Sequence, residues 1–294
     1  KILDNSINRD IGQRNHLIEG IKKFNDEDLI LLNDIDEIPN LEFFKYIILV
    51  MSKSEISFLA GLIILLLLAI FLPAIAQNQN YHNFADQRTF FGIKNASNTL
   101  SNLAFVIVGL WGLINFYKNK YIKITNAFSV LLNLFFITII LTGLGSSYYH
   151  LSPKDFTLVF DRLALSLTFA VILSMLANIR ISERSGFHTL AELIILAPLS
   201  VLLWNYNGNL TPYAVLQFGG IIIIVLTLLL TKAQKQSPCF ASLIILYGFA
   251  KVAEFYDVEI FNLSQNLISG HTLKHLIGAL AVLIFISPLK IKKI

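Results

Sequence analysis

Cysteine and charged residues are both scarce in this 294-residue sequence. The single cysteine, Cys239, excludes an intrachain disulfide framework and a cysteine-rich zinc site. Charged residues make up 14% of the chain, where a globular protein carries about 25%, and apolar residues make up 55%. Too few charges remain to solvate the surface of a soluble domain, so the composition excludes an ordinary soluble protein.

The few charges are unevenly distributed along the chain. Residues 1–50 hold 6 of the 23 Lys and Arg residues and 10 of the 19 Asp and Glu residues. The remaining 17 basic and 9 acidic residues lie in residues 51–294. The formal net charge of +4 is therefore the sum of the charges of an acidic leader, residues 1–50, and a cationic, apolar body, residues 51–294. Because the basic residues of the body are spread over short loops, we expect no binding to nucleic acid.

Eight apolar segments are long enough to be membrane spans, for which about 20 residues are needed. Lipid offers the backbone no hydrogen-bond partner, so continuous apolar runs of this length predict helices rather than a barrel. The predicted fold class is all-α: a polytopic membrane protein with a seven-helix core and one extra N-terminal transmembrane helix. The segments are 56–76, 99–117, 127–150, 156–178, 189–206, 210–231, 239–255 and 271–288.

The first apolar segment, within residues 51–79, has two interpretations. Met51-Ser52-Lys53 precedes it and Ala74-Ile75-Ala76 ends it, a pattern that a signal peptide shares. The run is longer than a normal signal core, which favours a retained transmembrane helix. Residues 80–294 form the seven-helix core under either interpretation.

Basic residues in the loops fall into two sets along the alternating topology. Eleven lie in one set and three in the other, which by the positive-inside rule predicts cytoplasmic N- and C-termini. The predicted cytoplasmic set is Lys53, Lys118, Lys120, Lys123, Arg180, Arg184, Lys232, Lys235, Lys290, Lys292 and Lys293, and the outer set is Arg88, Lys94 and Lys154.

Four ionisable residues fall at one depth in the outer layer of the membrane under this topology. His150 ends an outward-running segment, Asp161 lies early in the next, and His271 and His275 open the last. Ionisable residues at membrane depth are functional candidates by default. Taken singly, His150 could be an interfacial residue and Asp161 a partner of the helix dipole. The four residues lie at one depth on three segments, and this favours a functional site over separate structural roles.

The two histidines of the last segment are spaced to share one metal ion. His271 and His275 are four residues apart, on one face of a helix, and His150 supplies a third nitrogen. Three His ligands with one open position are typical of catalytic zinc, which lowers the pKa of bound water to about 7. Asp161 could orient or deprotonate this water, and Ser146, one turn before His150, could bind the substrate oxygen.

Other polar residues in the membrane have structural interpretations. Lys251 and Glu254, three residues apart, predict an ion pair within the bundle. Glu192 is interpreted as a buried hydrogen-bonding residue. Arg162 can snorkel outward or contact a lipid head group.

Three motifs resemble those of the alkaline ceramidases, part of a superfamily of seven-helix membrane hydrolases that includes adiponectin-receptor-like proteins. The pattern is a Ser three or four residues before a His, an Asp on the next helix, and His-x-x-x-His on the last. The resemblance covers residues 80–288 and is closest to bacterial members. The motifs are Ser146-Ser147-Tyr148-Tyr149-His150, Asp161-Arg162-Leu163 and Ser269-Gly270-His271-Thr272-Leu273-Lys274-His275.

The resemblance implies a zinc amidase of bacterial type, hence of a bacterial inner membrane. The loop charges place its active site toward the outer, periplasmic side. His150, His271 and His275 are implied as zinc ligands, Asp161 as base or water orienter, and Ser146 as stabiliser of the intermediate. The implied partner is a membrane lipid, ceramide or another N-acyl lipid, and no oligomeric state follows.

Eukaryotic members of the alkaline ceramidase family carry a calcium site, built from several acidic residues before the first core helix. This chain offers Asp86 there, with Asn95 near where an acid is expected, so calcium is not carried over. Two alternatives stay open for the function: a bis-histidine haem protein using His150 opposite His271 or His275, and a non-enzymatic receptor or transporter.

Residues 1–50 resemble a fragment of a bisecting-type N-acetylglucosaminyltransferase. Residues 14–16 and 26–39 are similar to its Asp-x-Asp region, in which Asp34 and Asp36 would bind a divalent metal and nucleotide-sugar. Fifty residues are too few to build that nucleotide-binding sheet. We interpret the leader as a non-functional remnant upstream of a separate reading frame that begins near Met51.

Overall fold

The computed structural model describes residues 51–121, 124–232 and 237–289. The chain divides into two compact units, Lys1–Ser57 and Phe58–Ile294, and every predicted site residue belongs to the second. The glycosyltransferase-like leader, residues 1–50, lies outside the described residues.

The described residues are helical, and no strand occurs among them. The longer helices are α3 (Lys53–Phe71), α5 (Leu103–Tyr117), α6 (Asn126–Leu151), α7 (Asp155–Arg180), α8 (Glu183–Asn207), α10 (Gly220–Leu230), α11 (Phe240–Phe255) and α13 (Gly270–Ile286). The shorter ones are η1 (Gln79–His82), α4 (Ala96–Ser101), α9 (Thr211–Ala214), the π-helix η2 (Val215–Gly219), α12 (Asp257–Leu263) and η3 (Ser287–Leu289).

Seven spans of the described chain are long and apolar enough to cross a membrane. This confirms the predicted class, an all-α polytopic membrane protein. The predicted segment 239–255 forms α11, whose 16 residues rise about 24 Å, less than the ~30 Å hydrocarbon core. The seven spans are Lys53–Phe71, Ala96–Tyr117, Asn126–Leu151, Asp155–Arg180, Glu183–Asn207, Thr211–Leu230 and Gly270–Leu289.

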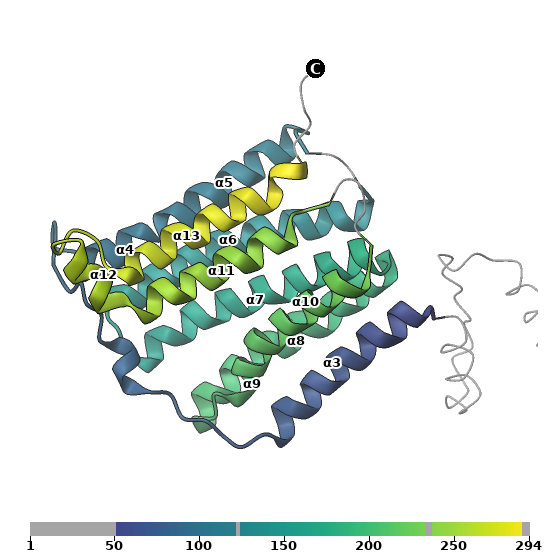
Figure 1. Ribbon diagram of the computed structural model, residues 1–294, viewed down its shortest axis with the longest axis horizontal. Helices are drawn as coiled ribbons and strands as arrows, with labels where there is room; N and C mark the ends of the chain where they lie inside the picture. The colour runs from purple at the N-terminus through teal and green to yellow at the C-terminus, as the bar shows by residue number, and fades with distance from the viewer. Residues whose placement is uncertain (1–50, 122–123, 233–236, 290–294) are drawn as a thin grey trace, which may run out of the picture. The chain divides into compact units, whose positions relative to one another are not determined.

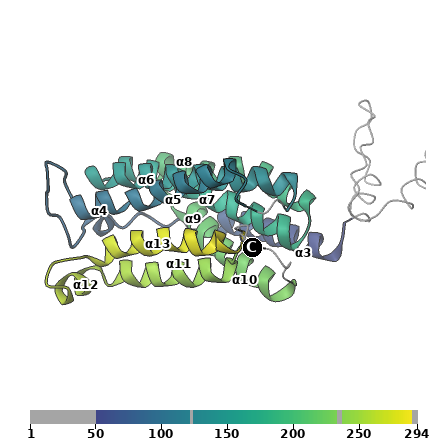
Figure 2. The same cartoon turned by 90° about the horizontal axis from the view of Figure 1, so that it is seen from above.

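The helices of the second unit form two layers. One contains α5, α6, α7 and α8, each packed on the next, and the other contains α13, α11 and α10 (Figures 1 and 2). Helix α13 also contacts α4 and α5, which closes one side of the bundle. The core between the layers is apolar, with Phe135, Phe136 and Phe285 fully buried.

Two helices differ from the predicted boundaries for local reasons. Helix α3 ends at Phe71 rather than at residue 76, because Pro73 disfavours helical geometry in the residue before it. Helix α8 begins at Glu183 rather than at residue 189, because the Ser182 hydroxyl accepts a hydrogen bond from the Ser185 backbone N–H and caps the helix.

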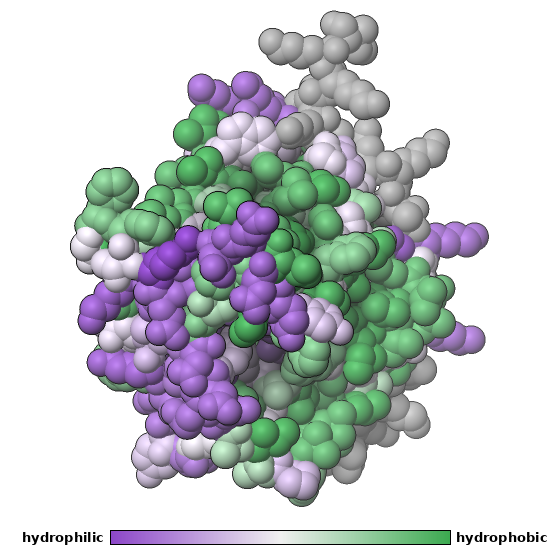
Figure 3. Space-filling view, turned by 60° about the vertical axis from the view of Figure 1, so that its left-hand side comes forward, coloured by the Kyte–Doolittle hydropathy of each residue, from purple (hydrophilic) through white to green (hydrophobic). Residues whose placement is uncertain are grey.

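Large apolar side chains are exposed along the flanks of the helices. Ile195, Ile222 and Leu229 are 66%, 58% and 76% exposed, on a surface that would be costly in water and suits lipid. Hydrophilic residues gather instead at the end of the bundle where α12 lies, which Figure 3 brings forward. Exposed apolar flanks together with a polar end form the surface pattern of a membrane protein.

Gly270 begins α13 where this helix approaches α11 more closely than a side chain permits. A Cβ at this position would collide with the backbone carbonyl oxygen of Ala253. We expect Gly270→Ala to lower the free energy of unfolding by about 1–3 kcal/mol, because backbone cannot move aside as a flexible side chain can.

Thermal unfolding in detergent measures this loss, with Gly248→Ala in α11 as the matched control. A Cβ at Gly248 meets no atom within 4 Å, so that variant should be as stable as the wild type or slightly more stable. Equal melting temperatures for Gly270→Ala and the wild type would contradict the close approach.

Candidate metal centre and lipid cavity

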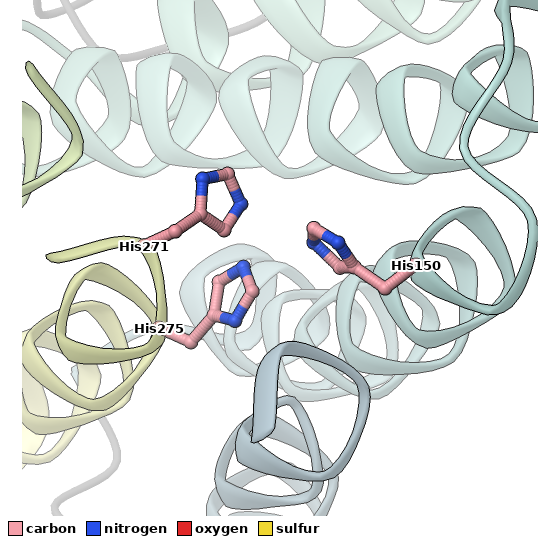
Figure 4. Close-up of side chains that lie close together, drawn as sticks. All are labelled: His150, His271 and His275. Atoms are coloured by element: carbon pink, nitrogen blue, oxygen red, sulfur yellow. The ribbon is translucent and has the colours of Figure 1, made fainter. Parts of the chain in front are cut away.

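Three buried histidines converge between α6 and α13. His150 lies in the last turn of α6, while His271 and His275 lie one turn apart at the start of α13. One ligand atom from each lies within 4.8 Å of the others, and the ring centroids are 4.8–4.9 Å apart (Figure 4). The structure thus brings together the three residues that the spacing and the topology singled out.

The donor atoms of this cluster fit a metal ion. Nδ1 of His150 and Nε2 of His275 are buried and have no hydrogen-bond partner among the described residues. Buried polar atoms in native proteins are nearly always paired, so unpaired imidazole nitrogens need an explanation. A divalent cation shared by the three imidazoles could supply the missing partner, because imidazole is a common ligand of such metals.

Neighbouring polar groups orient the two histidines of α13. The Ser101 hydroxyl lies 2.8 Å from Nδ1 of His275, and the Lys274 ammonium lies 3.1 Å from Nε2 of His271. The backbone N–H of His271 donates to Oδ1 of Asp257 at 2.7 Å. Such outer contacts fix the rotamer and orientation of metal-binding imidazoles.

Ser146 and Asp161 lie beside the histidines on adjacent helices. The Ser146 side chain is buried one turn before His150, and Asp161 lies in the second turn of α7, on the wall of the same cavity. A Cβ at Gly145 would lie 2.7 Å from the carbonyl oxygen of Phe160, so α6 and α7 approach closely at this level. This approach places the hydroxyl and the carboxyl next to each other.

A cavity of about 470 Å³ contains both of these residues together with His275. Its deeper wall is apolar, and Ile172 on α7 lies eleven residues beyond Asp161, about 16 Å further into the bundle. The cavity therefore joins a polar end, at His275, Ser146 and Asp161, to a long apolar interior. The apolar lining includes Phe135, Ile139, Phe169, Ile172, Ile224, Leu243, Ile244 and Val282.

A cluster of charged groups lines the polar end of the cavity. Glu254 accepts from Lys251 and from Lys274, each at 2.7 Å, so the predicted ion pair of residues 251 and 254 is confirmed and has a third member. The Tyr81 hydroxyl donates to Glu254 at 3.3 Å. Burial, and then the negative charge of Glu254, raise the pKa of the Tyr81 phenol, which keeps it a neutral donor.

Two polar residues of the segment before α4, Asp86 and Asn95, contact other groups of the protein. Asp86 pairs with Arg88 at 2.7 Å, and Asn95 donates to the backbone carbonyl of His150 at 2.9 Å. Burial alone would raise the pKa of Asp86, but hydrogen bonds from Arg88 and Ser97 outweigh it and hold this pKa below its usual range. The two residues considered for calcium are therefore already engaged.

The interpretation of Glu192 and one of the two alternatives for Arg162 are wrong. Glu192 is exposed on α8 rather than buried, because its face of the helix points away from the core. Arg162 does not snorkel outward, since its side chain is buried and lines the cavity, while its contact with a lipid head group stays a prediction. The sequence also contained no local signal for Asn98, which accepts from Thr272 at 2.7 Å and joins α4 to α13.

The fold and the site together define a class: an integral, multi-pass membrane protein with a buried three-histidine cluster, one member of which, His275, lines a largely apolar cavity. The sequence model of the ceramidase family matches residues 91–289, more than half of the chain, and the chain belongs to this family. No curated protein matches it. Membership in the family supports a membrane hydrolase that acts on the amide bonds of lipids.

Proposed function

We propose that the protein is a zinc-dependent amidase that cleaves the amide bond of ceramide or a related N-acyl lipid. The observation that carries this proposal is the placement of Ser146, Asp161 and His275 around the polar end of one apolar cavity, with His150 and His271 buried against His275. Residues 80–294 would form this hydrolase, and residues 51–79 its additional N-terminal helix.

In the proposed site, His150, His271 and His275 would hold the zinc ion, and a bound zinc would supply a water with a pKa of about 7. Asp161 takes the proton from the attacking water and returns it to the leaving nitrogen as the C–N bond breaks. The Ser146 hydroxyl donates a hydrogen bond to the oxygen that becomes negative when the carbonyl carbon turns tetrahedral. The products are a fatty acid and an amine.

The cavity suits a substrate with a long acyl chain. The apolar wall can bury the chain at about 25 cal/mol per Å² of apolar surface, while the amide stays at the polar end beside Asp161. A water-soluble amide would gain nothing from this wall. Ser146 and Asp161 favour a hydrolase over a bis-histidine haem protein, because haem ligation requires neither residue.

The distribution of basic residues supports an orientation for the proposed enzyme. Eleven basic residues in one set of loops against three in the other favour cytoplasmic termini. The histidine cluster then faces the outer side, which in a bacterial inner membrane is the periplasm.

Lipid-amide hydrolysis by the purified full-length protein tests the proposal. We expect turnover of N-palmitoyl amides, including ceramide, that is abolished by a chelator and restored by added zinc, because the metal supplies the nucleophilic water. Released palmitate measures the rate, and the metal content is determined in parallel. Failure to hydrolyse any amide in a chelator-sensitive way would reject the proposed function, and a Soret band would favour haem.

A further inference from the structure

Arg162 places an unpaired positive charge inside the cavity. Its side chain is 6% exposed, and its Nη1 has no hydrogen-bond partner among the described residues. Nη2 donates to the amide oxygen of Gln77, which is neutral. A buried charge with an unfilled donor is costly unless something pairs with it.

Aromatic rings surround the guanidinium but carry no charge. Its central carbon lies 4.1 Å from the ring centroid of Trp204, 5.2 Å from that of Tyr213 and 5.9 Å from that of Tyr81. Stacking of this kind holds the planar group in one orientation and keeps water from its faces. Nη1 is buried beside these rings, and its hydrogen-bonding capacity is unfilled among the described residues.

The acidic residues near Arg162 do not pair with it. Glu254 is engaged by Lys251 and Lys274, and no ion pair within 4.0 Å joins Arg162 to a carboxylate in the described ranges. The charge of Asp161, the preceding residue in α7, attracts the guanidinium without forming an ion pair at this distance. Both lysines of the cavity thus have an anionic partner within 4.0 Å, whereas Arg162 has none among the described residues.

We propose that Arg162 binds an anionic group on the amine side of the scissile amide. The substrate class is then an N-acyl lipid whose head group carries a carboxylate, sulfonate or phosphate, which the planar guanidinium can bind through two parallel hydrogen bonds. This deepens the proposed amide hydrolysis and rests on it: water adds to the carbonyl, the C–N bond breaks, and a fatty acid and an anionic primary amine leave.

The position of Arg162 in the cavity supports this assignment. It follows Asp161 at the polar end, while the apolar wall extends away in the other direction toward Ile172. With the acyl chain along that wall and the amide at Asp161, the amine side of the substrate points to the aromatic cage. An anion there fills the open donor of the guanidinium.

Paired substrates with the same acyl chain test the proposal on the full-length, zinc-loaded protein. N-palmitoylglycine and N-palmitoyltaurine carry an anion, N-palmitoyl-O-phosphoethanolamine a phosphate, and N-palmitoylethanolamine no charge. We expect the wild type to favour the anionic amides in kcat/KM. Arg162→Met should lower kcat/KM for them about 10- to 100-fold, mainly through KM, and change it less than about threefold for the neutral amide.

Two further variants separate the anion site from a structural role. Arg180→Met removes the same charge from the other end of α7, and it should leave the anionic-to-neutral ratio unchanged. Arg162→Lys keeps the charge but loses the planar fork, so this ratio should fall to an intermediate value even if the methionine variant does not fold. Equal losses on anionic and neutral amides, or a wild type that prefers the neutral one, would overturn the proposal.

A binding measurement distinguishes failure of this inference from failure of the proposed function. If the wild type hydrolyses none of the amides, the hydrolase assignment fails, and the melting temperature with N-palmitoyltaurine or N-palmitoylethanolamine then tests the anion site. N-palmitoyltaurine should stabilise the wild type more than Arg162→Met, whereas the neutral amide should stabilise both alike. Equal stabilisation of the two proteins by N-palmitoyltaurine would refute an anion site at Arg162.

Discussion

Replacement of His275 by alanine is expected to remove the bound zinc and to lower kcat/KM for lipid amides by at least about 1,000-fold. The imidazole of His275 is one of three that converge within 4.8 Å, and its Nε2 is buried without another partner. Two remaining ligands hold a zinc ion far more weakly than three. Metal analysis of the purified variant and initial rates on a matched lipid amide measure the two effects.

His188→Ala is the control for this experiment. His188 is exposed near the start of α8, and it is not one of the three clustered histidines. The control should keep its zinc and its full rate. A His275→Ala protein that retained one zinc ion per chain and the wild-type rate would exclude His275 as a ligand.

Asp161→Asn is expected to separate chemistry from metal binding. The amide side chain has nearly the same shape as the carboxyl but cannot accept the proton of the attacking water, so kcat should fall about 100- to 10,000-fold. Zinc content should stay at one ion per chain, because Asp161 is not part of the histidine cluster. Single-turnover rates and metal analysis on the same preparation measure the separation.

Asp155→Asn in the first turn of α7 serves as the control for the loss of a negative charge. Asp155 is exposed and pairs with His82 at 3.0 Å, away from Ser146. This variant should keep its kcat. If Asp161→Asn lost zinc in proportion to its activity, Asp161 would act on the metal site and not as the base.

The fold was largely predictable because few backbone structures are stable in lipid. Continuous apolar runs must form helices where no water is present, and their ends follow from local features such as Pro73 and the cap at Ser182. The bounds of α11 agree with the predicted segment 239–255 to within one residue. Its packing against α13 was not predictable in the same way, because it depends on residues distant in the sequence.

The candidate site was predictable where a spacing or a shared depth carried the signal. His271 and His275 are four residues apart, and the topology put His150 at the same level. The environment of Arg162 was not predictable, because Gln77, Trp204 and Tyr213 come from segments that only the folded chain brings together. The exposure of Glu192 likewise depends on which face of α8 meets the core.

The close approach at Gly270 limits which positions of the sequence can be substituted during evolution. The position of His271 is set by backbone, through the contact of Gly270 with Ala253 and through the carboxylate of Asp257, rather than by the side chains that face lipid. Exposed apolar residues such as Ile222 on α10 can exchange with other apolar residues, because lipid packs equally well against each. Proteins of this architecture can thus diverge over most of their outer surface and keep the same chemistry.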